Sequence, residues 1–241
     1  MSLATRLAAL AQAIGADIKA LLAGATREAR AYTECVGAVN TDAFTYTVSG
    51  TGAAWASVAA LTTQLGVLRL GLGTVATNRG SIAAPNMAVV RFGGGAARYQ
   101  SAIAFVTPSD ATNTYVFRDG FIDSITAEST DGAFFRYTNA VNAGKLQAVT
   151  RSNGVETATD TGITVTAGLK TRLKIEVNAA GTQALFYVNG TLVATNTTNI
   201  PTAAGRETGY GLYVQRTVGT VAVNAIDVDY IDTTIDYSTE R

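Results

Sequence analysis

Short runs in which apolar and polar residues alternate recur along most of the chain, and this period of two constrains the fold more than any other feature. Residues 44–49 read FTYTVS, and residues 173–178 read LKIEVN. Successive side chains of a β-strand point to opposite faces, so each run predicts a strand with one buried face. In the first run the predicted buried face carries Phe44, Tyr46 and Val48.

Many other short apolar runs are separated by clusters of Gly, Asn, Asp and Ser. Further strands are predicted at residues 66–73, 87–93, 99–106, 113–121, 133–138, 145–151, 162–165, 209–215 and 221–231. No helical pattern lies between them, which favours an all-β, antiparallel sandwich of the jelly-roll type. No repeat of fixed period is present, which argues against a propeller or a solenoid.

The stretch LFYVNGTLVAT at residues 185–195 predicts a β-hairpin. Asn189 and Gly190 both tolerate the positive φ angles of a two-residue type I′ turn. The expected pairing then runs outward from the turn: Val188 with Thr191, Tyr187 with Leu192, Phe186 with Val193 and Leu185 with Ala194. Both faces of this hairpin carry apolar side chains, so it is expected to lie within a layered fold as scaffold.

The first 24 residues follow a different period, typical of an amphipathic helix that ends near Gly24. Its apolar positions are expected to form an oligomerisation seam consisting of Leu3, Leu7, Leu10, Ile14, Ile18 and Leu21. Packing of the helix onto the chain's own sheet is the alternative. The predicted organisation is therefore a helix at 1–24 for oligomerisation or anchoring, a connector at 25–40 and a jelly-roll sandwich at 41–241.

Composition excludes several classes of function. The 241 residues include no histidine, the commonest general base and metal ligand, so a non-enzymatic protein without a cofactor is expected. Lys plus Arg equals Asp plus Glu at 18 each, which argues against binding to nucleic acid. Cys35 is the single cysteine and forms no disulfide within the chain. No apolar run is long enough for a membrane span, and Gln12, Asp17 and Lys19 interrupt any signal-peptide core.

Two glycine-rich stretches resemble nucleotide-binding loops only superficially. Residues 71–76, GLGTVA, match a dinucleotide fingerprint, but the residues that follow them do not predict the helix that the fingerprint requires. Residues 93–95 lack the Gly-Lys-Ser/Thr ending of a phosphate-binding loop and lie between two predicted strands, so they are expected to form a hairpin loop or a bulge.

The acidic stretch IDVDYIDTTID at residues 226–236 is the densest carboxylate cluster. Asp227 and Asp229 are expected on one face of a strand, opposite Ile226, Val228 and Tyr230. A solvated outer surface is the favoured interpretation; a calcium site and a pair of catalytic acids remain open. No catalytic or metal-binding residue is assigned, and no ligand-binding residue is identified. Trp55, Tyr210 and Tyr213 are conceivable ligand contacts but are expected to lie in the core.

Residues 132–201 and 218–231 resemble the C-terminal concanavalin A-like (laminin-G-like) domain of tailed-bacteriophage structural proteins. Residues 7–21 resemble the short N-terminal helix of phage tail-fibre and head-fibre chains. The recurrent elements are Phe135-Arg136-Tyr137, Val149-Thr150-Arg151, Asp160-Thr161-Gly162, Phe186-Tyr187-Val188-Asn189-Gly190 and Asn199-Ile200-Pro201. No long repetitive shaft lies between helix and sandwich, so the resemblance favours a short fibre over a full-length one.

The resemblance implies a non-enzymatic virion structural protein, trimeric, displayed on the virion surface after synthesis in the bacterial cytoplasm. Its expected partners are further copies of itself, other head or tail proteins and a host-surface glycan. A decoration protein without a receptor role is one alternative, and a polysaccharide depolymerase is another.

Overall fold

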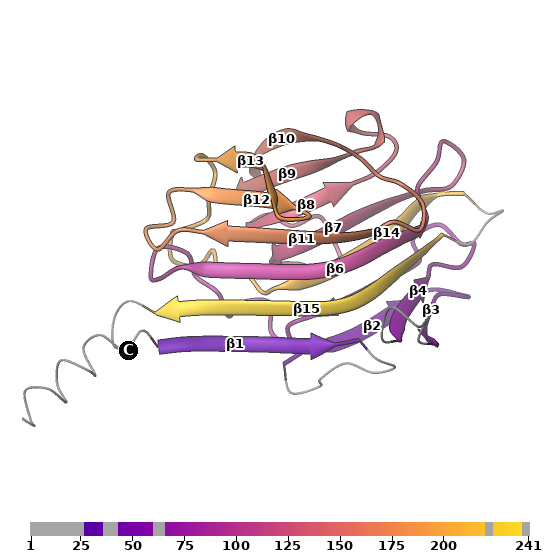
Figure 1. Cartoon of the computed structure of the whole chain (residues 1–241), viewed down its shortest axis with the longest axis horizontal. Coiled ribbons are helices and arrows are strands. Elements are labelled where there is room, and N and C mark those ends of the chain that lie inside the picture. The colour runs from indigo at the N-terminus through magenta and orange to yellow at the C-terminus, as the bar shows by residue number, and fades with distance from the viewer. Residues whose placement is uncertain (1–26, 36–42, 60–65, 220–223, 238–241) are drawn as a thin grey trace, which may run out of the picture.

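In the computed structural model, residues 27–35, 43–59, 66–219 and 224–237 are described, and they form two antiparallel β-sheets packed face to face (Figure 1). This arrangement confirms the predicted all-β sandwich. Within these ranges there is no α-helix, only a single 3-10 turn at Asn142–Gly144, and no helix is long and apolar enough to cross a membrane. The predicted helix and its seam lie outside the described residues.

The eight-stranded sheet contains the first and the last described strands. Its order is β13 (Thr191–Asn196), β12 (Ala184–Val188), β11 (Lys170–Val177), β6 (Ala97–Thr107), β15 (Ala225–Tyr237), β4 (Val67–Gly71) and β3 (Ala54–Val58), and β1 (Arg27–Glu34) also pairs with β15. β15 is long enough to pair with β6 along one edge and with both β4 and β1 along the other. Figure 1 shows β11, β6, β15 and β1 side by side.

The seven-stranded sheet lies behind the first in this view. Its order is β10 (Val155–Thr164), β9 (Lys145–Ser152), β8 (Gly132–Tyr137), β7 (Thr114–Ile122), β14 (Gly211–Val218), β5 (Arg79–Ala83) and β2 (Thr45–Ser49). Every strand pairing in both sheets is antiparallel, as the pattern of short alternating runs predicted.

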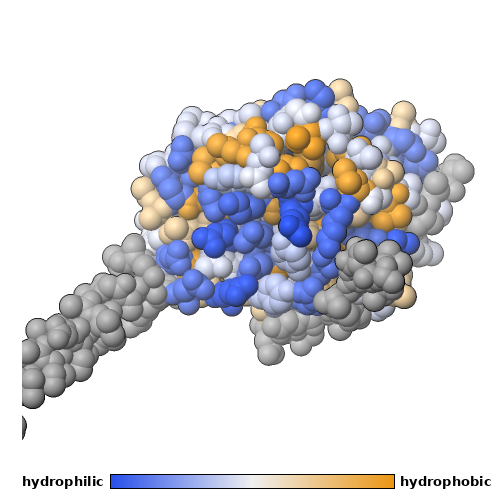
Figure 2. All heavy atoms as spheres, viewed as in Figure 1, coloured by the Kyte–Doolittle hydropathy of each residue, from blue (hydrophilic) through white to orange (hydrophobic). Residues whose placement is uncertain are grey.

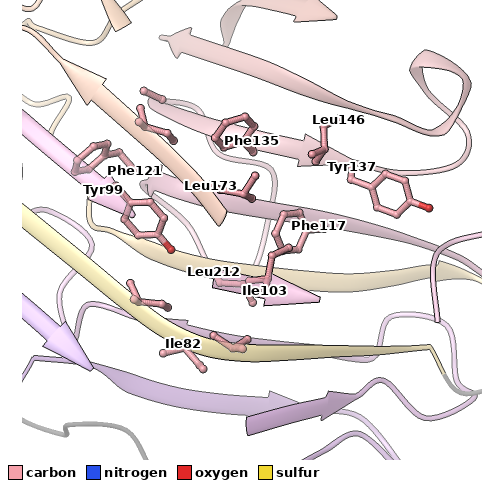
Figure 3. Close-up of a cluster of buried hydrophobic side chains, with 14 of the residues drawn as sticks. Ile82, Tyr99, Ile103, Phe117, Phe121, Phe135, Tyr137, Leu146, Leu173 and Leu212 are labelled. Carbon is pink, nitrogen blue, oxygen red and sulfur yellow. The ribbon is translucent and has the colours of Figure 1, made fainter. Parts of the chain in front are cut away.

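The main core fills the space between the sheets (Figure 3). Ile103 and Leu173 enter it from the eight-stranded sheet, and Phe117 and Phe135 enter it from the seven-stranded sheet. Aromatic rings from opposite sheets meet edge to face, as in the 4.9 Å centroid contact between Phe105 and Phe117. The alternation in β11 is confirmed, because its apolar positions are buried and its charged positions lie on the outer face.

The alternation in residues 44–49 predicts that Phe44, Tyr46 and Val48 are buried, but only Phe44 is. Phe44 is fully buried, whereas Tyr46 and Val48 are exposed by 46% and 43%. β2 is the last strand of its sheet, so its apolar side chains extend beyond the cover of the opposite sheet. The strand predicted at residues 87–93 is also wrong: only Val90 forms an isolated bridge, with Thr208.

The predicted hairpin is present, with one change of register. Asn189 and Gly190 form the turn at φ 50° and 85°, and Val188 and Tyr187 pair as predicted. Beyond them Phe186 pairs with Ala194 rather than Val193, because a β-bulge inserts one residue into β13. A bulge of this kind leaves no signal in the apolar pattern.

Part of the segment predicted as connector belongs to the sandwich. Residues Arg27–Glu34 form β1, which runs antiparallel to the final part of β15. Its predominantly polar sequence is consistent with the exposure of residues 28–30, which cover the edge of β15 without entering the core. Cys35 follows directly and is fully buried, and this burial raises the pKa of its thiol to about 12.

The two glycine-rich stretches lie at connections between strands, and the strand predicted through residue 73 ends at Gly71. Residues 71–76 leave β4 and lead into β5 rather than into a helix, and Gly73 adopts a positive φ of 61°. Residues 93–95 form the approach to β6, where Gly95 lies against the backbone of Asp236 so closely that a Cβ would collide with it. Neither stretch presents a phosphate-binding helix.

Candidate functional site

The outer face of the eight-stranded sheet has a shallow furrow above β6. Along this strand Tyr99, Ser101 and Ile103 point into the sandwich and are buried, so Ala102 and Ala104 lie on the outer face. Both are small, whereas their neighbours on β11 and β15 have larger side chains. We define the furrow as the space over Ala102 and Ala104 between the side chains of these two flanking strands.

Strand register fixes which side chains face each other across the furrow. Ala102 lies between Arg172 of β11 and Tyr230 of β15. Two residues after Ala102 on β6, Ala104 lies between Lys170 and Asp227. Two residues before Ala102, Gln100 lies between Lys174 and Asp232. The β11 wall is therefore cationic, and the β15 wall is acidic and aromatic.

Two adjoining hollows follow this furrow and share Lys170. One, of about 550 Å³, is lined by Gln100, Lys170, Arg172, Leu173, Lys174, Asn189, Gly190 and Tyr230. The other, of about 270 Å³, is lined mainly by Val58, Val67, Arg69, Ala102, Ala104, Val106, Lys170, Asp227 and Asp229. Figure 2 shows this face, with hydrophilic residues across its middle and hydrophobic residues towards its upper border.

Tyr230 reaches the furrow because β15 contains a bulge. The sequence pattern placed Tyr230 with the buried Ile226 and Val228, and this prediction is wrong. The register shifts between Val228 and Tyr230, so the extra residue, Asp229, turns Tyr230 to the outer face beside Ala102. There its ring stacks on Tyr32 of β1, with 6.5 Å between centroids and 30° between the ring planes.

The two aspartates of the acidic stretch do line one hollow, but each has a cation as partner. The Arg69 guanidinium donates to both oxygens of Asp227, at 2.6 and 2.8 Å, and the Lys170 ammonium pairs with Asp229. Among the described residues no three His, Cys, Asp or Glu side chains are grouped as a metal site. The two carboxylates thus act as ion-pair partners in this wall.

Three polar side chains around Ala102 are not engaged in this way. The Gln100 amide, the Arg172 guanidinium and the Tyr230 hydroxyl have no hydrogen-bonding side-chain partner in the described part of the chain. The remaining cation of this wall, Lys174, is bonded to Glu176 at 2.9 Å and lies 3.9 Å from the Tyr187 ring centroid. An amide, a guanidinium and a phenol beside an open hollow can together hydrogen-bond hydroxyl or carboxylate oxygens and offer a ring for stacking.

The surroundings of Tyr230 raise the pKa of its hydroxyl. Partial burial is the main cause, the Arg172 guanidinium opposes it, and the nearby carboxylates of Asp229, Asp232 and Glu34 add to it. The phenol therefore remains protonated at neutral pH and can donate a hydrogen bond.

The aromatic residues considered from the sequence are structural, as expected. Tyr213 is fully buried, and Tyr210 packs edge to face on Phe44 with 5.4 Å between centroids. Trp55 is half-buried against the core and donates its indole N–H to the Thr47 carbonyl at 3.0 Å. The furrow residues Gln100, Arg172 and Tyr230 were missed, because alternation assigns residues to a face without showing which strands are neighbours.

Comparison with known proteins identifies the fold. Residues 63–229 match the family model described as "SO2946-like, C-terminal domain". Among solved structures, a protein of unknown function, SO2946 from Shewanella oneidensis MR-1, is similar with a TM-score of 0.66 and 13% identity over 90% of both chains. No curated protein matches the chain by sequence.

Two further structures have the same fold but named activities. An endo-1,3-β-glucanase from Streptomyces sioyaensis has a TM-score of 0.57 and 14% identity, over 86% of this chain and 96% of its own. The Emp46p carbohydrate recognition domain has a TM-score of 0.52 and 8% identity, over 86% and 95%. At this low identity the likeness shows the fold, a concanavalin A-like sandwich that serves both lectins and glucanases.

Proposed function

We propose a function for this chain from its membership of the family of SO2946-like C-terminal domains, to which residues 63–229 belong. In this proposal it is a non-enzymatic protein that binds a glycan in the furrow of its lectin-like sandwich. The single observation that carries this proposal is the trio of Gln100, Arg172 and Tyr230 around Ala102, whose polar groups have no hydrogen-bonding side-chain partner among the described residues. Sugar-binding sites combine planar aromatic faces with side chains that can exchange hydrogen bonds with hydroxyl groups. The furrow offers both, along two connected hollows that suit an extended chain of sugars.

The cationic β11 wall favours an acidic glycan. Lys170 and Lys174 each have a carboxylate partner, whereas Arg172 has none among the described side chains. A guanidinium presents two parallel N–H groups to a carboxylate, which makes Arg172 the natural contact for a uronic acid. A fold relative, an endo-β-1,4-glucuronan lyase from Trichoderma reesei with a TM-score of 0.53, acts on an acidic polysaccharide.

We further propose that the sandwich is displayed on the particle of a tailed bacteriophage, as a trimeric short tail or head fibre. The support is the resemblance of residues 7–21 and 132–201 to phage fibre chains. In this proposal the helix at 1–24 joins the copies or anchors them to other virion proteins. The furrow then carries the contact with a host-surface glycan.

A depolymerase is the less favoured candidate. Glycosidic cleavage requires one carboxylic acid that donates a proton and a second carboxylate that acts as base or nucleophile. The acids of the furrow are Asp227, Asp229 and Asp232, and each is held by a cation. A decoration protein without a receptor role stays open, and it requires no ligand in the furrow.

The test is to measure glycan binding with two furrow variants and a matched control. Binding is first located on a glycan array and then measured by calorimetry. Arg172→Ala removes a guanidinium and is expected to weaken binding at least about tenfold, the loss expected from one charged hydrogen bond. Ala104→Leu fills the furrow and is expected to weaken binding because the ligand and the larger side chain cannot occupy the same space. Ala158→Leu, an exposed strand position of the other sheet, serves as control and keeps full affinity.

Three outcomes oppose the proposal. Full affinity in both furrow variants would place the ligand elsewhere. Absence of any glycan ligand for the wild type would favour the decoration protein. Release of reducing ends from a bound polysaccharide would show a depolymerase.

A further inference from the structure

Arg118 is a charged side chain almost completely enclosed on the opposite side of the molecule. It lies on the outer face of the seven-stranded sheet, between Tyr213 of β14 and Arg136 of β8, and its side chain is only 5% exposed. Its guanidinium carbon lies 5.6 Å from the centroid of the Tyr213 ring. Burial, together with the charges of Arg136 and Arg151, lowers the pKa of Arg118 to about 10, and Tyr213 and Glu156 oppose this shift.

The hydrogen-bonding capacity of this guanidinium is only partly used. Nη2 donates to one carboxylate oxygen of Glu128, whereas Nε and Nη1 are buried without a hydrogen-bond partner among the described residues. Burial of an unpaired polar group is costly, and for a charged group the cost is larger. A planar carboxylate that faced Arg118 squarely would bond to two of its nitrogens at once.

Glu128 does not face Arg118 in this way, because it bridges two arginines. Its other oxygen accepts a bond of 3.0 Å from Nη1 of Arg151. Arg136 is bonded to both oxygens of Glu156, at 3.0 and 3.1 Å, and Arg151 lies 3.7 Å from the same carboxylate. Three guanidinium groups thus share two carboxylates, and the cluster has one excess positive charge.

The carboxylate of Glu128 can leave while its loop stays in place. The loop between β7 and β8 is held at both ends. Asp123 accepts hydrogen bonds from Thr130 and Asp131, and Ile125 packs against the smaller buried cluster that contains Ile122 and Phe134. Glu128 lies between these anchors with its side chain 41% exposed. Rotation about its side-chain bonds is enough to move the carboxylate from Arg118 into solvent.

We propose that Arg118, Arg136 and Arg151 form a second binding site, which is specific for a carboxylate. Without ligand, the carboxylate of Glu128 occupies this site, and a carboxylate from an external ligand displaces it. The external carboxylate bonds to Arg118 through two nitrogens, and Glu128 turns outward. This site is separate from the furrow, because it lies on the other sheet, and it does not depend on the proposed function of the furrow.

The test compares the wild type with Glu128→Gln, using glucuronate as probe and calorimetry or ligand-induced chemical shifts as readout. The internal carboxylate competes with the probe, so its removal is expected to tighten glucuronate binding by about tenfold if Glu128 occupies the site about nine-tenths of the time. Glu156→Gln is the matched control: it removes a carboxylate of the same cluster that is bonded to Arg136 rather than to Arg118, and no such gain is expected. Every protein in this comparison also carries Arg172→Ala, because the furrow is itself proposed to take a uronic acid through Arg172. The glucuronate binding that is measured then reports the Arg118 cluster.

Further arms make the assignment falsifiable. Glucose, which is neutral, is expected not to bind, and inorganic phosphate is expected to bind at least several-fold more weakly than glucuronate. With Arg172→Ala also present, Arg118→Gln in the Glu128→Gln background is expected to abolish glucuronate binding. If that variant does not fold, Arg136→Gln takes the place of Arg118→Gln and is expected to weaken glucuronate binding. The proposal is overturned if Glu128→Gln gains no affinity, if Glu156→Gln gains as much, or if phosphate binds as tightly as glucuronate.

Discussion

Asp119 is a carboxyl group buried between the two sheets, and in the described part of the chain hydroxyl groups are its hydrogen-bond partners. Tyr99 and Ser101 donate to its two oxygens, each at 2.5 Å. Burial raises the pKa of Asp119 to about 7, and the two hydroxyl donors oppose that rise. This residue therefore makes the stability of the sandwich depend on pH.

The sign of this dependence follows from the two pKa values. In the unfolded chain an aspartate has a pKa of about 3.9, so between about pH 4 and pH 7 the folded state binds more protons. Asp119 therefore contributes most to the free energy of unfolding below this window. As the pH rises through the window this contribution is lost, and the loss is on the order of a few kcal/mol. Asp119→Asn, which is neutral at every pH, is expected to remove this loss.

Urea unfolding of both proteins at pH 5 and pH 8 measures the effect. Other carboxylates titrate in both proteins, so the informative quantity is the difference between wild type and Asp119→Asn at each pH. We expect the unfolding free energy of the variant minus that of the wild type to be larger at pH 8 than at pH 5. An equal difference at the two pH values would show that the Asp119 pKa is not raised.

At the scale of elements, the sequence predicts where strands form more readily than it predicts how far each strand is buried and which strands are its neighbours. β11 matches its pattern because it lies inside its sheet and faces the core with every second residue. β2 has the same pattern but lies at an edge, and β1 has too few apolar residues to be recognised. The bulge at Asp229 moves Tyr230 to the outer face, and neither the bulge nor the furrow follows from periodicity. The furrow exists because β11, β6 and β15 are neighbours, which is a property of the topology.

The turn of the β12–β13 hairpin provides a test at this scale. Gly190 has a φ of 85°, and a Cβ there would meet no atom within 4 Å, so any penalty comes from the backbone and not from a clash. A β-branched residue is strained at this angle, and Gly190→Val is expected to cost about 1 to 3 kcal/mol of unfolding free energy. Thermal or urea unfolding measures this loss.

Gly190→Asn is the control for that turn, because asparagine tolerates a positive φ far better than valine. It is expected to lose clearly less stability than Gly190→Val. Equal losses in the two variants would indicate that the cost does not arise from the turn geometry.

At the scale of the whole molecule, the sandwich has its own core, and assembly is predicted to depend on the seam at residues 3–21. Burial of an unpaired charge in such a seam costs several kcal/mol per chain, and a symmetric oligomer repeats that cost in every copy. Leu10→Asp is therefore expected to dissociate the oligomer while the sandwich stays folded. Light scattering reports the mass, and far-UV circular dichroism reports the β-structure. A monomeric wild type at high micromolar concentration would refute the seam.

The pairing of β1 with β15 places the start of the first described strand beside the end of the last one. Arg27 is the register partner of Tyr237, so the two ends of the described sandwich lie about 5 Å apart. A short glycine-rich link between them, with new termini opened between the exposed Ala203 and Ala204, would leave every strand pairing in place. The sandwich is therefore expected to fold when its sequence is circularly permuted in this way.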